Sequence, residues 1–335
     1  MVKGLKTIGC LLLIFFVLAC SNNPDLPDIS NSNVQLTFNR FEKDLFINND
    51  WNQENISTLK EKYPEFLPAF TEYIIRIGHI DDPALYMHLN RFKNDPDIIE
   101  VKNKVFSIYN DAMTEEFTAI ENAFKYYHVY FPDRNIPKII TFISGFNYAI
   151  VTDSTYLGIG LDMFLGKDEP FYTRLGYPKY KSANMTRQHL VSSAIAGWLT
   201  TEFEQPNAEA NLLEEMIHYG KILYLTHHLL PNTEETTVLG YSKEQLEWCK
   251  KNEKEIWFFF IDNELLYNNE TKNKTNFLGE APFVKGFPEG SPGRVGQWIG
   301  YRIVESYLKN NSVNWNEFMQ NNNAQEILNK SKYKP

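Results

Sequence analysis

Segment 212–231 carries the residues that come closest to a catalytic pattern. Glu214, Glu215 and His218 follow the spacing Glu-Glu-x-x-His, which differs at one position from the His-Glu-x-x-His of zinc peptidases. In that motif two imidazoles one helical turn apart hold zinc, and the glutamate beside the first imidazole activates water. Glu214 takes the place of the first histidine, so one required ligand is missing. We therefore predict no catalytic zinc site, and these three residues are the ligands to expect if a metal is bound.

The pair Glu215 and His218 also matches half of a carboxylate-bridged di-iron motif. That site needs a second Glu-x-x-His pair and two further glutamates, and the sequence contains no second pair. His227 and His228 lie about three helical turns further along, too far away to complete the same site. The sequence thus predicts neither a metal nor another cofactor.

The other reactive side chains form weaker patterns. Gly158-x-Gly160 lies in a strand-like run and lacks the lysine and serine of a phosphate loop, and no Gly-x-Ser-x-Gly nucleophile elbow is present. Cys249 is the one cysteine expected to keep a free thiol after processing, since Cys20 should be lipidated, and we interpret it as a packed residue rather than a nucleophile. His189 has neither a following glutamate nor a second histidine in reach, which favours a polar residue at a helix end.

A polar aromatic segment is a candidate surface for a partner. It contains Tyr172, Tyr177, Lys179 and Tyr180. Aromatic side chains with a polar end are enriched where proteins meet. An alternative function, a periplasmic ligand-binding lipoprotein, would require these tyrosines to line a concave pocket.

The first twenty residues have the character of a bacterial lipoprotein signal. Lys3 and Lys6 precede an apolar run, residues 8–18, that is too short for a comfortable membrane span. Small residues then lead to Cys20, whose thiol can accept a diacylglyceryl group. We predict a signal peptide over residues 1–19 and stable anchoring through lipid on Cys20. An ordinary signal peptide with an incidental cysteine, or an N-terminal anchor helix, are the alternatives.

Composition indicates a folded domain on a tether. The 335 residues, 43% of them hydrophobic, are enough for a large core. The net charge of −9 becomes more negative when Lys3 and Lys6 are removed, which disfavours nucleic acid as a partner. Residues 20–33 are rich in Asn, Pro, Asp and Ser and should form the lipidated, flexible tether. Residues 34–335 show no internal repeat and are expected to form a single domain.

The elements that position these residues are predicted to be mostly helical. Apolar spacing predicts two helices within 98–130, further helices over 187–201, 212–230 and 243–267, and a long helix after Pro292. A strand is expected within 34–46, and β-branched runs predict two or three strands within 138–161. Residues 268–293 read as a surface loop. The fold class is therefore α+β, a mostly helical single domain with a small antiparallel or mixed sheet.

Three glycines are predicted to bring helices close together. Gly220 lies within the helix expected over 212–230, and Gly296 and Gly300 lie four residues apart in the last long helix. Because glycine has no Cβ, these positions should let a helix press its backbone against a neighbour.

Short segments in order along almost the whole mature chain resemble one family. The matching segments are Arg40-Phe41-Glu42-Lys43, residues 131–140, residues 165–168, residues 220–225 with 229–231, Trp248 with Asn252-Glu253 and Ile256-Trp257, residues 265–267, Pro282-Phe283, residues 291–303 and the ending 329–335. No single segment is diagnostic, but the ordered set resembles the GldB gliding motility lipoproteins of the Bacteroidetes.

The resemblance implies a lipid-anchored, periplasm-facing protein of the cell envelope. Such a protein is required for gliding and is linked to the machinery that moves and secretes adhesins. Ser21 after Cys20 is compatible with sorting to the outer rather than the inner membrane. Family members have no established catalytic residues, so none is assigned here. The leading hypothesis is accordingly a non-catalytic envelope protein that binds other envelope proteins.

The family also resembles zinc-peptidase-like proteins at a distance, which implies a zincin-like layout without a complete metal motif. By this analogy helix 187–201 would take the place of the metal-binding helix and helix 212–230 that of the later ligand helix. Residues 188–192 lack the motif. The rival hypothesis is a lipid-anchored, zinc-dependent hydrolase that uses Glu214, Glu215 and His218 with a ligand from elsewhere.

Overall fold

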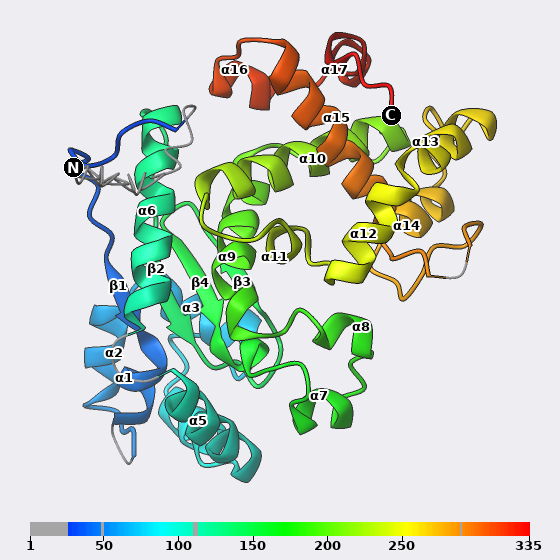
Figure 1. Cartoon of the computed structure of the whole chain (residues 1–335). Helices are drawn as coiled ribbons and strands as arrows, with labels where there is room; N and C mark the ends of the chain where they lie inside the picture. Colours follow the sequence, from blue (N-terminus) through cyan, green and yellow to red (C-terminus); the bar gives the residue numbers. More distant parts are fainter. Residues whose placement is uncertain (1–25, 48–49, 110–112, 289) are drawn as a thin grey trace, which may run out of the picture.

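Four short strands form a sheet that separates two parts of the hydrophobic core (Figure 1). The computed structural model describes residues 26–47, 50–109, 113–288 and 290–335. The strands are β1 (Phe38–Arg40), β2 (Lys138–Phe142), β3 (Ile150–Thr152) and β4 (Tyr156–Gly160), in the order β1-β2-β4-β3. β1, β2 and β4 run parallel, and β3 is antiparallel to β4. The sheet is therefore mixed, and the strand expected within 34–46 is its edge strand β1.

The side chains of β2 alternate between the two parts of the core. Ile140 and Phe142 belong to one cluster of buried residues, and Ile139 belongs to the other. Successive side chains of a strand point to opposite faces of the sheet. Since both faces are covered, the strand is apolar nearly throughout, as its run of β-branched residues predicts.

Two glycines of β4 make room for neighbouring groups. A Cβ on Gly158 would lie 2.5 Å from Cγ2 of Val151, and a Cβ on Gly160 would lie 2.1 Å from the carbonyl oxygen of Tyr148. Real Cβ atoms do not approach that closely. The Gly158-x-Gly160 pattern is thus a packing feature of a strand, as the sequence indicates.

One face of the sheet is covered by helices from the N-terminal third of the chain. These are α1 (Phe41–Ile47), α2 (Ile56–Lys62), α3 (Phe66–Ala69), a π-helical turn (Phe70–Ile74) and α4 (Leu85–Lys93). The ring of Phe66 lies 5.0 Å from that of Phe41 and 5.6 Å from that of Phe142 in β2. Offset and edge-to-face aromatic contacts of this kind stabilise a core beyond the area that they bury. Aromatic rings therefore join these helices to the sheet.

The opposite face is covered by α6 (Thr114–Tyr130) and α9 (Arg187–Glu202). Trp198 of α9 meets Phe124 of α6 edge to face, with ring centroids 6.0 Å apart. Before α6 lies α5 (Pro96–Ile108), which confirms the two helices predicted within 98–130. A 3₁₀ turn (Leu161–Phe164) and the short helices α7 (Pro170–Arg174) and α8 (Lys179–Ser182) connect β4 to α9.

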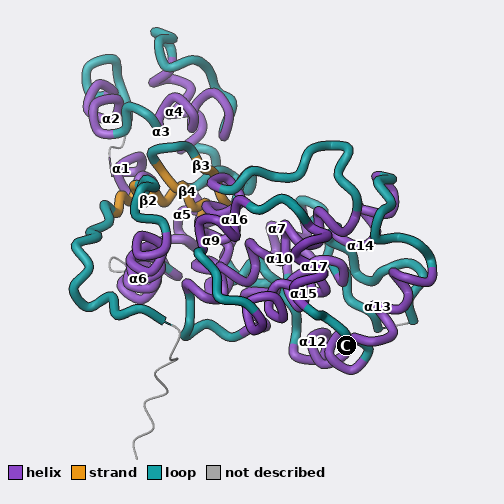
Figure 2. The backbone as a smooth tube through the Cα atoms, turned by 90° about the horizontal axis from the view of Figure 1, so that it is seen from above, coloured by secondary structure: helices purple, strands orange, loops and turns teal. Residues whose placement is uncertain are grey.

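The C-terminal half is helical. Its elements are α10 (Leu212–Leu229), α11 (Glu235–Leu239), α12 (Lys243–Lys251), α13 (Glu253–Asp262), α14 (Thr271–Leu278), α15 (Val295–Asn310), α16 (Trp315–Gln320) and α17 (Ala324–Ser331). Figure 2 shows α1–α4 and the strands towards one end of the molecule and α13 and α14 towards the other. Two predictions are corrected: segment 243–267 forms two helices that meet at Asn252, and the loop predicted over 268–293 contains α14.

The axis of this half is the crossing of α10 and α15. A Cβ on Gly220 of α10 would lie 2.3 Å from the carbonyl oxygen of Gly300, and a Cβ on Gly300 of α15 would lie 1.7 Å from the carbonyl oxygen of Met216. The two backbones touch, and no other residue type fits at either position. The prediction that Gly220 and Gly300 bring helices close together is confirmed, and Gly296 likewise lies against the backbone of Phe277.

The fold class predicted from the sequence, mostly helical α+β with a small mixed sheet, is confirmed. Among the described residues, no helix has the length and apolar character needed to cross a membrane. The predicted signal peptide and Cys20 lie outside the described residues, so their assignment stays a prediction.

Candidate functional site

The two carboxylates of the catalytic-like pattern take part in structural contacts. Asn211 precedes α10, its Oδ1 accepts the backbone N–H of Glu214 at 3.1 Å, and Oε2 of Glu214 accepts the backbone N–H of Asn211 at 2.8 Å. This reciprocal arrangement is a capping box, which satisfies N–H groups that a helix start leaves unpaired. Glu215 pairs with Nζ of Lys274 in α14 at 2.8 Å.

His218 lies on α10 one turn beyond Glu214 with its Nε2 buried. That atom has no hydrogen-bond partner among the described residues. Burial, and to a smaller extent the charge of Lys221, lowers the pKa of the imidazole from 6.5 to about 4. His218 is therefore neutral at physiological pH. In the part of the chain that the structure describes, no group of three or more His, Cys, Asp or Glu side chains could hold a metal ion.

A cavity of about 170 Å³ brings Glu214 and His218 together with Lys221. We call it the α10 cavity; its other walls are residues 204–210 and the turn at Asn321. The positions of Glu214, His218 and Lys221 are four and three residues apart, which places them on one face of a helix. Glu215 does not line this cavity. Of the three residues predicted as possible metal ligands, the structure therefore brings only Glu214 and His218 to one cavity.

Lys221 is the residue of this site that the sequence interpretation missed. It is 4% exposed, and its Nζ donates to the carbonyl oxygens of Asn321 at 2.6 Å and Met319 at 3.4 Å. Burial lowers the pKa of its amine to about 8. The spacing from His218 and the interruption of an apolar helix face by a lysine are signals that could have found it. Because Met319 and Asn321 end α16, Lys221 ties α10 to the C-terminal helices.

The four residues of the candidate partner surface differ in exposure, and one of them is buried. Tyr172 is 1% exposed; its hydroxyl donates to the carbonyl oxygen of Asp162 at 2.9 Å and accepts the N–H of Leu165 at 3.0 Å. Tyr172 is thus a core residue, and its inclusion in a surface was wrong, because its hydroxyl satisfies buried backbone groups. Lys179 is exposed and Tyr180 half-buried on α8.

Tyr177 is half-buried, unlike the buried Tyr172 and the exposed Lys179. Its hydroxyl donates to the carbonyl oxygen of Phe146 at 2.9 Å. Phe146 lies between β2 and β3, so this hydrogen bond holds that loop to the segment before α8. Of the four residues, Lys179 and Tyr180 remain available to a partner.

Cys249 is a packed residue, as the sequence indicates. It is fully buried, and burial raises the pKa of its thiol to about 12. The thiolate, rather than the thiol, is the nucleophilic form of cysteine. Cys249 is therefore poorly suited to covalent chemistry at physiological pH.

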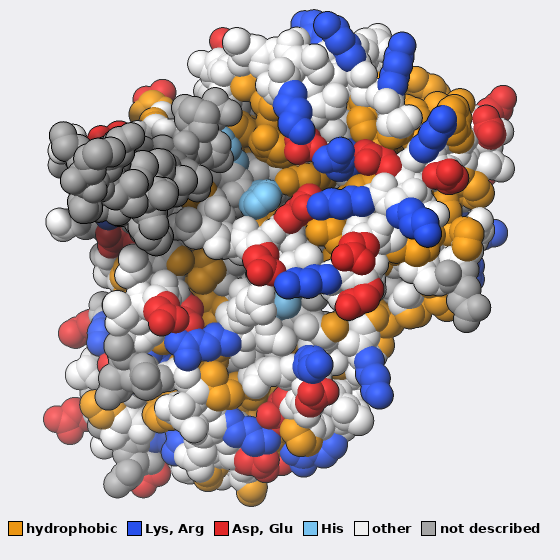
Figure 3. All heavy atoms as spheres, viewed as in Figure 1, with side chains coloured by type: hydrophobic (Ala, Val, Ile, Leu, Met, Phe, Trp, Pro, Cys, Tyr) orange, Lys and Arg blue, Asp and Glu red, His pale blue; other side chains and the backbone are white. Residues whose placement is uncertain are grey.

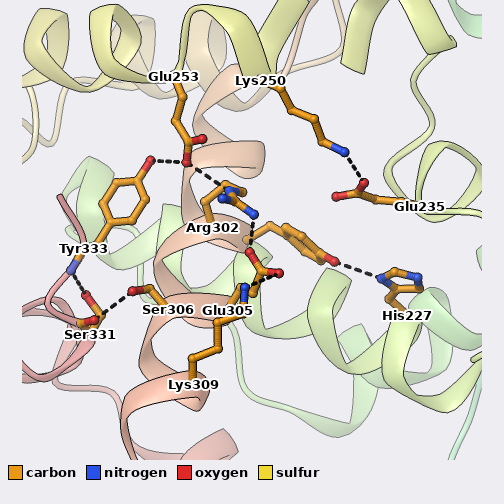
Figure 4. A network of polar contacts seen from close by, with 11 residues as sticks. His227, Glu235, Lys250, Glu253, Arg302, Glu305, Ser306, Lys309, Ser331 and Tyr333 are labelled. Carbon is orange, nitrogen blue, oxygen red and sulfur yellow. Dashed lines mark hydrogen bonds and ion pairs between the residues drawn. The ribbon is translucent and has the colours of Figure 1, made fainter. Parts of the chain in front are cut away.

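The C-terminal segment is tied to α13 and α15 by a polar network (Figure 4). Nε of Arg302 and the hydroxyl of Tyr333 both donate to Oε1 of Glu253 at 2.9 Å. Oγ of Ser306 donates to the carbonyl oxygen of Ser331 at 2.8 Å. On the face shown in Figure 3, acidic and basic side chains alternate across this half of the molecule. The C-terminal residues are therefore hydrogen-bonded to α13 and α15 and form part of the helical half.

Comparisons with known proteins identify one family. A family model described as "Gliding motility protein GldB" matches residues 22–335. The comparisons with curated proteins and with solved structures gave no match, and the zinc-peptidase-like relationship stays a prediction. Since the matched range includes the sheet, the helical half and the C-terminal network, the chain belongs to the GldB family of gliding motility proteins.

Proposed function

We propose that this protein is a non-catalytic, lipid-anchored protein of the cell envelope that is required for gliding motility. In this proposal it works in contact with envelope proteins of the gliding and secretion machinery. The observation that carries the proposal is the family match over residues 22–335. The match begins two residues after Cys20, so it covers all but the first two residues of the chain that would remain after signal cleavage.

The predicted lipid on Cys20 supports a place at the periplasmic side of the outer membrane. Two or more acyl chains give stable anchoring, because each buried methylene contributes roughly 0.8 kcal/mol. Ser21 after Cys20 is compatible with outer-membrane sorting. Residues 21–33 would then serve as the tether between the lipid and the folded domain.

The contacts of Glu214 and Glu215 support a non-catalytic role. A general base must have a carboxylate that can reach a substrate or a water molecule. Glu214 closes the capping box of α10, and Glu215 pairs with Lys274, whose ammonium also donates to the carbonyl oxygens of Ala208 and Ala210. These contacts give both carboxylates a role in the fold.

A clean deletion of the gene tests the proposal in the source organism. Spreading on agar is expected to be abolished or impaired, and expression of the wild-type chain in the deletion strain should restore it. Normal spreading by the deletion strain would contradict a role in gliding.

Zinc content separates the proposal from the hydrolase alternative. Protein purified without chelator is expected to contain no stoichiometric zinc, and a Glu215→Gln chain should restore spreading as well as the wild type does. Stoichiometric zinc that disappears in a His218→Ala chain would favour the hydrolase.

Crosslinking and affinity capture of the native lipoprotein test the proposed partners. Envelope proteins of the gliding or secretion machinery should be recovered with the wild-type chain. Their absence from the captured material would count against a role in contact with that machinery.

A further inference from the structure

A second cavity, of about 300 Å³, lies beside the start of α9. Its walls come from α8, the start of α9, the turn between α11 and α12, and the segment before α15, whose elements can be followed in Figure 1. We call it the Arg294 cavity. It shares no lining residue with the α10 cavity. Its volume is at the lower end of the range found for ligand sites.

Arg294 is held in this cavity by an unusual local structure. Its backbone is left-handed, with φ 60° and ψ 22°, a conformation that non-glycine residues adopt only where their surroundings impose it. Nη2 of Arg294 donates to the carbonyl oxygen of Gly240 at 2.8 Å, and Nδ2 of Asn184 donates to the same oxygen at 3.0 Å. A Cβ on Gly240 would lie 2.8 Å from both side chains. The guanidinium is thus fixed by the fold at the cavity wall.

The cavity carries unbalanced positive charge. Among the described residues, no carboxylate lies within ion-pair distance, 4.0 Å, of Arg294 or of Lys167, which also lines the cavity. The acidic residue of the lining, Glu280, pairs with Lys181 at 3.8 Å. A guanidinium without a carboxylate partner is suited to bind an anion, because its planar N–H groups match two oxygen atoms at once.

The neutral groups of the lining could meet a ligand larger than an inorganic ion. Oε1 of Gln245 accepts the N–H of Ser242 at 2.9 Å, which leaves its amide N–H groups for another acceptor. Nδ2 of Asn184 is used on Gly240, which leaves its Oδ1 as an acceptor. The hydroxyl of Tyr180 has no described hydrogen-bond partner. These groups can pair with the C=O and N–H groups of a peptide.

His189 is consistent with this charge distribution. Its Nδ1 lies 2.8 Å from Oγ1 of Thr186. Burial lowers the pKa of the imidazole, and the nearby charge of Arg294 lowers it further. His189 is therefore a neutral part of the wall, and the lasting positive charges are those of Arg294 and Lys167.

We propose that the Arg294 cavity binds the C-terminal carboxylate of a peptide chain. The carboxylate pairs with the free edge of the Arg294 guanidinium, and Lys167 adds a second positive charge at the wall. The volume equals roughly ten times the share of one water molecule in the liquid, so it holds more than a carboxylate alone. The last residues of the peptide fill the rest, with Asn184 and Gln245 meeting its backbone. This assignment does not depend on the role in gliding, since binding alone tests it.

Affinity selection with a tripeptide library tests the assignment on the full-length lipoprotein in detergent micelles. One library contains N-acetylated tripeptides with free C-termini, and the other contains the same tripeptides as C-terminal amides. The protein is expected to retain free acids about tenfold more than amides, the factor for one charge-assisted hydrogen bond. Acetate and inorganic phosphate, added as competitors, should displace the peptides weakly.

Variants of the cavity and a matched arginine complete the experiment. Arg294→Gln should reduce retention of the free acids about tenfold, and Lys167→Gln should reduce it by a smaller factor. Arg174→Gln removes an exposed arginine outside the cavity and should leave retention unchanged. If Arg294→Gln fails to fold, Lys167→Gln decides, because the exposed Lys167 has no described ion pair.

Three outcomes would overturn the assignment. The first is that the wild-type chain retains the free acids and the amides equally, or retains neither of them. The second is unchanged retention in the folded Arg294→Gln chain or, where that chain does not fold, in the Lys167→Gln chain. The third is complete displacement of the peptides by phosphate at concentrations at which acetate has no effect, which would indicate a phosphate site.

Discussion

The buried imidazole of His218 should make the stability of the protein depend on pH. Its pKa is lowered from 6.5 to about 4 by burial and, less, by Lys221. The unfolded chain therefore takes up this proton at a higher pH than the folded chain does. The stability that the neutral ring contributes is fully present above pH 6.5 and is lost as the pH falls towards 4. We expect the loss to be on the order of 2 kcal/mol, after allowance for partial exposure.

Denaturant unfolding of the wild type and of His218→Leu at pH 7 and pH 4.5 measures this effect. The variant should lose less stability than the wild type over this interval. At pH 7 it should be at least as stable, because it removes a buried polar atom that lacks a partner. His79→Leu is the control, since the side chain of His79 is 63% exposed. A His218→Leu chain with the full wild-type pH dependence would show that another group causes it.

Residue spacing predicted that Glu214, Glu215 and His218 share a helix, and the structure confirms this. It could not predict what each side chain contacts. Glu214 turns back to the start of its own helix, which the pattern Asn-x-x-Glu signals, whereas Glu215 meets Lys274, a residue distant in sequence. Local partners can be read from a pattern of capping residues. Remote partners depend on how helices pack, which a single sequence does not specify.

The capping box at the start of α10 should contribute measurably to stability. Asn211→Ala removes the acceptor for the N–H of Glu214 and is expected to lower the free energy of unfolding by about 1 kcal/mol. Urea denaturation at pH 7 measures the change. Asn211→Asp keeps an acceptor at the same place and should retain most of the stability. Equal losses in both variants would mean that the cap does not cause the effect.

The crossing of α10 and α15 should tolerate no side chain at Gly220. Gly220→Leu would place a Cβ 2.3 Å from the backbone of Gly300, so the helices must separate. Overpacking costs typically 1–3 kcal/mol and outweighs the gain of about 1 kcal/mol from helix propensity. We expect a loss of at least about 2 kcal/mol, measured by thermal and urea unfolding. Lys309→Leu on the exposed side of α15 should change stability little, and unchanged stability in Gly220→Leu would contradict the crossing.

Long periodic segments were predicted well at the scale of elements, and short ones were not. The helices at 187–201 and 212–230 lie where expected, because each has an apolar face several turns long. Helix α14 was missed because its sequence is mostly polar, and its buried apolar residues are only Phe277 and Leu278, near its end. The division at Asn252 was missed because both flanking segments have helical spacing. Nδ2 of Asn252 donates to the carbonyl oxygen of Trp248 at 2.7 Å, and α12 ends just before this residue.

For the whole molecule, the ending of the chain is part of the fold. The hydroxyl of Tyr333 donates to Glu253, and burial raises the pKa of Tyr333. Tyr333→Phe removes this hydrogen bond and is expected to lower the free energy of unfolding by about 1–2 kcal/mol. Tyr73→Phe, at an exposed tyrosine, should have almost no effect. Equal stability of the Tyr333→Phe chain and the wild type in urea would show that the network adds little.

The place of the molecule in the cell is expected to depend on one cysteine outside the described residues. In Cys20→Ala the acyl chains cannot be attached, so the chain should leave the washed membrane fraction and spreading should be impaired. Its thermal unfolding should match that of the wild type, because both core clusters lie between Phe41 and Tyr333. Cys10→Ala is the matched control, since Cys10 lies in the predicted signal peptide and should leave fractionation unchanged. A Cys20→Ala chain that is cleaved and still stays with the washed membrane would show that lipid on Cys20 is not what holds the protein there.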